Sequence, residues 1–286
     1  MISLEAPAKV NLWLRVVGER PDGFHLLETE MALLELADQL LLLPGAAGLR
    51  VDAPPGEEIP LDRSNLAWRG LLAGLGADPQ LICLTLEKRV PAAAGLGGGS
   101  SDAAAAWRLG RHASGASEAA SAVELASLAL IGADVPFFAA QRAMALVSGI
   151  GEIVAPAPPR AATPVILVSP GFPLSTRAVF AKLRPADLAS DRPAGNDLLA
   201  PALRLRPELG DLMARIRKEG IEPQLTGSGP TLFSLVDDPE QAAATTARLR
   251  SMGLQVTQTR LRTLPAAIVE IDDARNDAGA PQRGVG

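Results

Sequence analysis

A run of glycines near residue 97 is the segment of this 286-residue chain that could do chemistry most directly. Residues 91–104 read PAAAGLGGGSSDAA and lead into an alanine-rich stretch typical of a helix. Glycine lets the backbone turn its N–H groups toward a ligand, and a helix N-terminus adds unpaired N–H groups and partial positive charge. These features predict a cradle for phosphate. The alternative is a flexible loop with serine caps, but a position between a strand and a helix favours anion binding.

This glycine loop differs from two common nucleotide motifs. No lysine follows the glycines, so it is not a Walker A motif, and the glycines lack the spacing of a dinucleotide fingerprint. The hydroxyls of Ser100 and Ser101 could bind phosphate oxygens or a magnesium ion.

A lysine and an asparagine near the N-terminus are the second candidate for chemistry. Apolar residues alternate from Leu4 to Val16, which predicts a strand with Lys9 and Asn11 on its other face. Both side chains could therefore reach one pocket. An exposed pair on an edge strand is equally compatible with the spacing.

Two further segments could contribute to a site. Asp134 lies in an apolar surround, GADVPFF, where it is either a helix N-cap or a functional carboxylate, and the residues alone favour the cap. Residues 225–231 read LTGSGPT between two expected strands. They form either a tight hairpin or a second glycine-rich loop at a ligand.

Composition excludes several classes of protein. The formal net charge of −5 argues against broad nucleic-acid binding. The single cysteine, Cys83, excludes a disulfide framework, and two distant histidines, His25 and His112, argue against a histidine-rich metal site. The N-terminus lacks the pattern of a signal peptide and no run of about 18 apolar residues occurs, so we expect a cytoplasmic protein without a membrane span.

Lysine is rare among the basic residues, which we attribute to codon bias toward arginine. One corollary is that a lysine marks a place that needs a compact ammonium rather than a planar guanidinium. The lysines are Lys9, Lys88, Lys182 and Lys218.

The elements expected around these segments mix strands and helices without strict alternation, which predicts an α+β fold. A stretch rich in proline and alanine at residues 154–164 predicts a domain boundary. We expect one domain over residues 1–155, a second over 156–264, and a disordered tail over 265–286. The expected strands cover residues 4–16, 26–43, 80–87, 165–169, 222–226, 231–236 and 255–261. The expected helices begin at Ser64, Ser100, Ser117, Ser175, Pro207 and Pro239.

The Lys9 strand, the glycine loop and the LTGSGPT segment, in that order, resemble the three signature motifs of the GHMP kinases. The segments APAKVNL, PDGFH, GLGGGSSDAA and GADVP narrow the resemblance to kinases that phosphorylate the 2-hydroxyl of a cytidine diphosphate conjugate of methylerythritol, an isoprenoid precursor. The resemblance spans residues 6–261. It implies an N-terminal domain like ribosomal protein S5 domain 2, a ferredoxin-like C-terminal domain, ATP and Mg²⁺ as cofactors, and an active site between the domains.

The resemblance also implies roles for particular residues. Lys9 and Asp134 match the catalytic pair, and Ser101 is the expected magnesium ligand. The ATP-binding residues would be Pro91, Ala92, Ala93, Ala94, Gly95, Leu96, Gly97, Gly98, Gly99, Ser100 and Ser101. The residues that bind the cytidyl substrate would be Asn11, Phe24, His25, Thr176 and Phe180. The family usually has a tyrosine where this chain has Phe24, and Asn196-Asp197 resembles a family pair without an assigned role.

Three other functions compete with this interpretation. Another GHMP kinase acting on a different small alcohol would lack the Asp-Gly-Phe-His segment. A nucleotide-binding sensor without turnover would have lost Lys9 or Asp134. RNA binding would need a basic, aromatic surface, and only 3% of the residues are aromatic. We therefore expect a small-molecule substrate, no nucleic-acid or membrane partner, and a monomer or homodimer.

Overall fold

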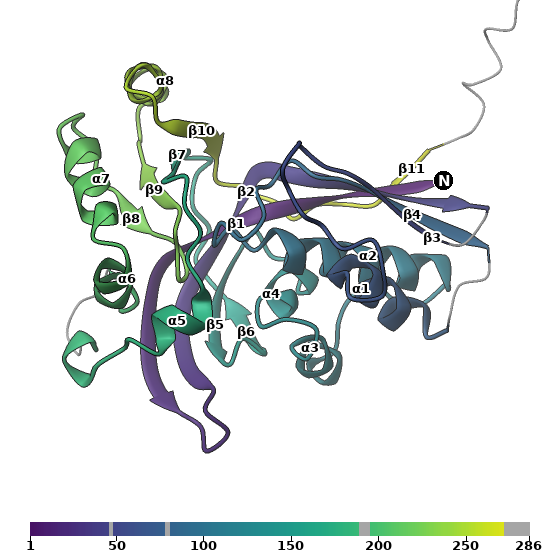
Figure 1. Cartoon of the computed structure of the whole chain (residues 1–286). Coiled ribbons are helices and arrows are strands. Elements are labelled where there is room, and N and C mark those ends of the chain that lie inside the picture. The colour runs from purple at the N-terminus through teal and green to yellow at the C-terminus, as the bar shows by residue number, and fades with distance from the viewer. Residues whose placement is uncertain (46–47, 78–80, 189–194, 272–286) are drawn as a thin grey trace, which may run out of the picture.

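The computed structural model describes residues 1–45, 48–77, 81–188 and 195–271, and its strands form two sheets (Figure 1). The larger sheet contains seven strands, five of them in the order β11-β1-β2-β4-β3; β5 pairs with β2, and β6 pairs with β5. Its strands are β1 (Ile2–Glu19), β2 (His25–Pro44), β3 (Gly48–Asp52), β4 (Ile82–Glu87), β5 (Met144–Gly149), β6 (Ile153–Pro156) and β11 (Val269–Glu270).

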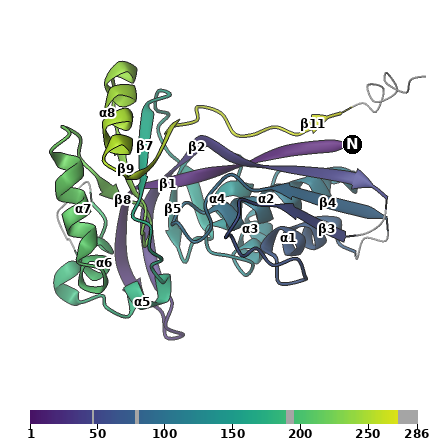
Figure 2. The same ribbon diagram turned by 45° about the horizontal axis from the view of Figure 1, so that its top comes forward.

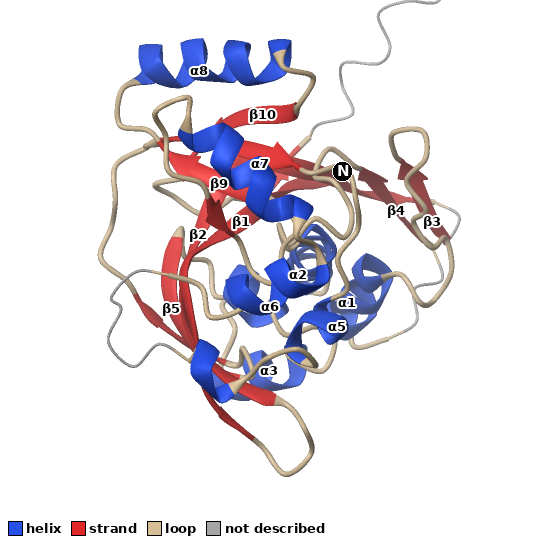
Figure 3. Ribbon diagram, turned by 60° about the vertical axis from the view of Figure 1, so that its left-hand side comes forward, coloured by secondary structure: helices blue, strands red, loops and turns tan. Residues whose placement is uncertain are grey.

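The smaller sheet is antiparallel throughout and has the order β10-β7-β9-β8. Helix α8 lies against β10 and β7 (Figure 3). Its strands are β7 (Pro164–Ser169), β8 (Gln224–Leu225), β9 (Leu232–Leu235) and β10 (Gln255–Arg260). Mixed strands and helices in two layered halves confirm the predicted α+β class.

Helices α1 to α4 lie on one face of the larger sheet (Figure 2). Helices α1 and α2 pack closely because Gly70 and Gly74 of α1 have no side chain: a Cβ at these positions would meet the carbonyl oxygens of Ala103 and Trp107 at 2.0 and 2.2 Å. The helices are α1 (Leu66–Leu75), α2 (Gly98–Ala113), α3 (Ala122–Leu128), α4 (Val135–Ala139), α5 (Thr176–Phe180), α6 (Leu199–Leu205), α7 (Glu208–Arg217) and α8 (Pro239–Ser251), with a 3-10 turn at Pro185–Asp187.

The β1–β2 hairpin connects the two halves. Its N-terminal part packs with α1 and α2, whereas Leu14 and Val16 belong to the apolar core of the C-terminal half. The hairpin turns at residues 20–24, where the Gly23 N–H donates to the Arg20 carbonyl at 2.9 Å and Gly23 has a φ of 84°. One strand therefore carries Lys9 and Asn11 between the two expected domains.

Several local expectations are wrong. The helix expected at Ser117 begins at Ala122, because Ser121 and Glu124 form a capping box. Asn65, not Ser64, caps α1: its Oδ1 accepts the Ala67 N–H at 2.9 Å. Residues 265–271 are not a disordered tail, since β11 pairs with β1. The rest of that expected tail, residues 272–286, lies outside the described residues.

The sequence pattern did not predict β3, α4, β5, β6, α6 or β11, which are short or irregular. None of the helices in the described ranges has the length and apolar content needed to cross a bilayer.

Candidate active site

Lys9 and Asn11 lie side by side in the middle of β1, where both are buried at 3% and 2% exposure. The Lys9 Nζ donates to the Asn11 Oδ1 at 2.6 Å, and the Asn11 Nδ2 donates to the Thr29 Oγ1 of β2 at 2.9 Å. Their burial excludes the exposed edge-strand alternative. The β1–β2 register shifts on both sides of this pair, as expected where a bulge redirects side chains.

Asp134 faces this pair. Its Oδ2 lies 3.5 Å from the Lys9 Nζ, and 30% of its side chain is exposed. Asp134 occupies the position before α4, but its side chain makes no capping hydrogen bond with the residues that the structure describes. The carboxylate is thus directed at an ammonium rather than at the helix backbone, which favours the functional interpretation over the cap.

The glycine loop packs on β1 beside Lys9. The Lys9 N–H donates to the Leu96 carbonyl at 2.9 Å. Gly97 has a φ of 72°, and a Cβ there would lie 3.0 Å from both the Lys9 Cγ and the Phe138 ring. Helix α2 begins at the next residue, so its first N–H groups lie next to the catalytic candidates. This is the predicted order of strand, glycine loop and helix N-terminus.

The second glycine-rich segment closes the site from the C-terminal half. A Cβ on Gly227 would lie 3.2 Å from the Lys9 Nζ, and a Cβ on Gly95 would lie 2.7 Å from the Gly229 carbonyl oxygen. The two glycine loops therefore contact each other and Lys9. The segment 225–231 therefore packs against the glycine loop and Lys9 as well as connecting β8 and β9.

Asn196 holds that second loop in place. Its Nδ2 donates to the carbonyls of Leu225 and Gly227 at 2.9 and 2.7 Å. Asp197 ties the same segment to β1, because its Oδ2 accepts the Val16 N–H at 2.9 Å. The Asn-Asp pair thus joins β1 to the second glycine loop.

A cavity of about 240 Å³ lies where these segments meet. Apolar residues from β1, β2 and α6 form part of its wall, and polar residues from the loops form the rest. It is lined by Lys9, Asn11, Leu14, Leu27, Met31, Gly95, Gly97, Ser100, Ala133, Asp134, Thr176, Phe180, Leu198, Gly227 and Ser228.

The aromatic residues lie at one end of this cavity. Phe180 of α5 lines it and packs on His25, with ring centroids 4.7 Å apart. The Thr176 and Ser228 hydroxyls are hydrogen-bonded at 2.7 Å. Phe24 is 60% exposed in the hairpin turn and lies outside the cavity wall. The structure therefore brings together all the expected substrate residues except Phe24.

The two serines of the glycine loop differ in direction. Ser100 lines the cavity, and a Cβ on Gly132 would lie 3.2 Å from its Oγ. Ser101 is 1% exposed, and its Oγ has no hydrogen-bond partner within the described part of the chain. It lines a separate small pocket with Leu4 and Arg108. Ser100, and not the expected magnesium ligand Ser101, therefore faces the cavity, because one helical step of about 100° separates the two side chains.

Some residues of the site were not candidates from the sequence. Thr226 accepts the Asn11 N–H at 3.1 Å, and Ser228 lines the cavity; both lie in the LTGSGPT segment, whose glycines were the only signal. Thr29 orients Asn11 from within an apolar strand, where no pattern marked it.

Comparison with known proteins identifies the family. The GHMP kinases N terminal domain matches residues 65–142, and the GHMP kinases C terminal domain matches residues 184–254. The chain belongs to the GHMP kinase family.

Within this family, two similar curated proteins carry the same name. The chain is 38% identical to the 4-diphosphocytidyl-2-C-methyl-D-erythritol kinase of Methylorubrum extorquens, over 91% of this chain and 99% of that protein. It is 39% identical to the enzyme of that name from Thermus thermophilus, over 87% and 92% of the two chains.

Solved structures agree with this relationship. A crystal structure of 4-(cytidine 5'-diphospho)-2C-methyl-D-erythritol kinase is 35% identical, covers 91% of this chain and 98% of its own, and has a TM-score of 0.76. A homoserine kinase from Cytophaga hutchinsonii is 16% identical, covers 94% and 97%, and has a TM-score of 0.66, which shows a shared fold alone.

Proposed function

We propose that the protein transfers the γ-phosphoryl group of ATP to the 2-hydroxyl of 4-diphosphocytidyl-2-C-methyl-D-erythritol, a step in the non-mevalonate synthesis of isoprenoid precursors. The relatives at 36–39% identity carry that activity in their names. The observation that carries the proposal is the buried Lys9 ammonium, 3.5 Å from the Asp134 carboxylate, in a cavity that the glycine loop also lines.

Phosphoryl transfer needs positioning and neutralisation of charge more than covalent help from the protein. The N–H groups of the glycine loop and of the start of α2 would hold the ATP phosphates. Lys9 would stabilise negative charge between the attacking oxygen and the γ-phosphate. Asp134 would accept the hydrogen bond, and then the proton, of the substrate hydroxyl. Asn11 fixes the lysine because its Oδ1 accepts a hydrogen bond from the Lys9 Nζ at 2.6 Å.

Magnesium fits this site only together with nucleotide. No group of three or more potential His, Cys, Asp or Glu ligands occurs in the ranges that the structure describes. Mg²⁺ is commonly bound through one or two carboxylates plus substrate phosphates, and it would supply charge neutralisation there. Asp134 and Ser100, both in the cavity wall, are the residues that would hold it.

The cytidyl group would bind at the aromatic end of the cavity. Phe180 and His25 pack there with their rings tilted by 31°, and the exposed Phe24 would cover the base from the hairpin turn. Stacking on an aromatic side chain suits a base. We also propose a cytoplasmic enzyme, in agreement with a small, phosphorylated substrate.

The test measures ADP release with ATP and a panel of alcohols. The panel contains the cytidyl substrate, methylerythritol phosphate without the cytidyl group, mevalonate and homoserine. We expect turnover with the first compound alone. Turnover with mevalonate or homoserine would assign a different GHMP kinase activity. ATP binding without turnover of any alcohol would indicate a nucleotide sensor.

A further inference from the structure

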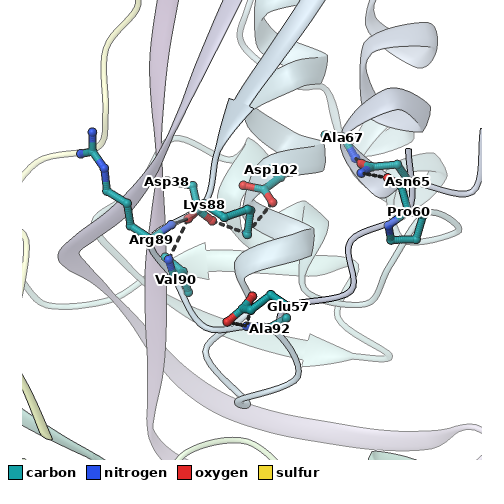
Figure 4. Close-up of polar contacts among 10 residues, drawn as sticks. All are labelled: Asp38, Glu57, Pro60, Asn65, Ala67, Lys88, Arg89, Val90, Ala92 and Asp102. Carbon is teal, nitrogen blue, oxygen red and sulfur yellow. Dashed lines mark hydrogen bonds and ion pairs between the residues drawn. The ribbon is translucent and has the colours of Figure 1, made fainter. Parts of the chain in front are cut away.

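A second buried ion cluster lies next to the active site but outside the cavity wall (Figure 4). Lys88, directly after β4, donates to the Oδ2 of Asp102 on α2 at 2.8 Å and also to the Oδ2 of Asp38 on β2. The side chains of these three residues are at most 4% exposed. Lys88 and Lys9 are thus the two buried lysines of the chain's four, and each faces a carboxylate.

The cluster is tied to the beginning of the glycine loop. The Asp38 Oδ1 accepts the N–H groups of Arg89 and Val90 at 2.5 and 2.8 Å. The Lys88 N–H donates to the Asp52 carbonyl of β3 at 2.7 Å. The residues that start the loop therefore have their backbone fixed by the same carboxylate that binds the lysine (Figure 4).

The same ammonium supports the end of the loop. A Cβ on Gly98, the first residue of α2, would lie 3.3 Å from the Lys88 Nζ and 3.1 Å from the Val90 Cγ1. Asp102, one turn further along α2, is the other carboxylate partner of Lys88. The Lys88 ammonium thus lies beside Gly98 at the end of the loop and binds Asp38, which holds the backbone at its start.

The two carboxylates are not equivalent. Burial raises the pKa of Asp102 to about 8; Lys88 opposes this shift and Asp38 adds to it. The Asp102 Oδ1 has no hydrogen-bond partner among the residues that the structure describes, whereas both oxygens of Asp38 are used. Burial thus favours the neutral form of Asp102, whereas Asp38 uses both oxygens to hold Lys88 and the start of the loop.

We infer that Lys88 is a positioning residue for nucleotide binding: its ammonium, hydrogen-bonded to Asp38 and Asp102, sets the distance between the two ends of the glycine loop. This inference rests on the proposed function, because it assumes that the loop binds the phosphates of ATP. Lys88 does not line the cavity, so it acts through the backbone of the loop and not on the reacting atoms.

The first test compares Lys88→Met with Arg108→Met. Arg108 is also a buried cation on the α1–α2 layer, at 5% exposure, and donates to the Ala266 carbonyl and to Glu118. Both substitutions should lower the melting temperature. Only Lys88→Met should raise the KM for ATP, by about tenfold or more, which corresponds to about 1.4 kcal/mol of lost binding. The kcat at saturating ATP should change much less than the KM.

Equal KM values for ATP in the two variants would overturn the inference and leave Lys88 as a stabilising residue. That result would not affect the proposed function, which fails only if the wild-type protein does not phosphorylate the cytidyl substrate.

If Lys88→Met does not fold, a second pair of variants tests whether the cluster positions the glycine loop for ATP. Asp102→Asn replaces a protonated acid by a neutral group of the same shape, so its KM for ATP should stay close to that of wild type. Asp38→Asn removes the anion that binds Lys88 and two backbone N–H groups, and should raise the KM by about tenfold or more. Similar KM values for ATP in Asp102→Asn and Asp38→Asn would overturn the inference that Lys88 and Asp38 position the glycine loop.

Discussion

Lys9 of β1 and Asp134 at the start of α4 face each other with 3.5 Å between the Nζ and Oδ2 atoms. The lysine is almost fully buried and the carboxylate is 30% exposed, so the pair has one side open to the cavity. A substrate hydroxyl that enters the cavity would meet the carboxylate first and the ammonium behind it.

Substitution of Asp134 by Asn tests this arrangement. Asn keeps the shape of the side chain, but it cannot accept the proton of the hydroxyl. We expect kcat to fall by about a hundredfold or more, the range for general acid–base catalysis, with nearly unchanged ATP affinity. Lys9→Ala should also lower kcat, and the double variant should lose far less than the product of the two losses. Full activity of Asp134→Asn would show that the carboxylate has no catalytic role.

Gly97 offers a test of the close approach between the glycine loop and Lys9. Gly97→Ala places a Cβ 3.0 Å from the Lys9 Cγ, and its φ of 72° adds strain. Gly115 has nearly the same φ, 71°, but nothing lies within 4 Å of a Cβ placed there. Gly115→Ala is therefore a control that introduces the backbone strain without the steric contact. Left-handed strain costs on the order of 1–2 kcal/mol in both variants. We expect loss of kcat/KM in Gly97→Ala only, measured as ADP release; equal activities would show that the contact is unimportant.

The exposed Phe24 provides a test of base recognition that does not disturb folding. Its side chain is 60% exposed, so Phe24→Ala should leave the melting temperature unchanged. Stacking on a base contributes about 1–3 kcal/mol, and the KM for the cytidyl substrate should therefore rise about tenfold or more. Val17, 53% exposed on the same hairpin, gives the control Val17→Ala. An unchanged KM in Phe24→Ala would restrict base recognition to the His25–Phe180 end of the cavity.

Asn196 should be needed as a hydrogen-bond donor. Its Nδ2 donates to the carbonyls of Leu225 and Gly227, and Asp at this position would place a carboxylate against both oxygens. Because Gly227 adjoins Lys9, displacement of the loop should lower kcat/KM by about tenfold or more, the factor given by 1.4 kcal/mol. Asn65→Asp is a matched control, since the Asn65 Nδ2 donates to the Pro60 carbonyl outside the cavity wall. Equal losses in both variants would argue against a special role for Asn196.

The sequence predicted the catalytic candidates better than their surroundings. Lys9 and Asn11 follow from alternation along one strand, and the glycine loop before a helix follows from residue types. The sequence could not show which of Ser100 and Ser101 faces the cavity, because that depends on the rotation of α2 about its axis. That rotation is set by packing on α1 through Gly70 and Gly74.

The residues that hold the loops could not be predicted. Asp38 lies in an apolar strand, and its partners Lys88 and Asp102 come from two other elements. Asn196 acts on backbone carbonyls of a distant segment, which carry no signal in the sequence. Residues 265–271 carry no periodic pattern that predicts an element, yet Ala266 is buried against the N-terminal half after the chain returns from the C-terminal half.

Asp102 should make stability depend on pH with the opposite sign to an ordinary ion-paired carboxylate. Burial raises its pKa from 3.8 to about 8, against the influence of Lys88 and with that of Asp38. Between these values the folded protein keeps a proton that the unfolded chain has lost. The contribution of Asp102 is therefore fully present below pH 3.8 and is lost progressively as pH rises to about 8.

Asp102→Asn removes this titration. We expect wild type to lose free energy of unfolding relative to Asp102→Asn between pH 5.5 and 8.5, measured by urea denaturation at each pH, with a slope of at most about 1.4 kcal/mol per pH unit. Asp187 is the control, because the hydrogen bond from Arg204 lowers its pKa and its contribution is lost only as pH falls through the acid range. Asp187→Asn should therefore run parallel to wild type across this window. If the free energy of unfolding of wild type ran parallel to that of Asp102→Asn across this pH range, Asp102 would be ionised in the folded protein. The assignment of a neutral carboxylic acid under the glycine loop would then be wrong.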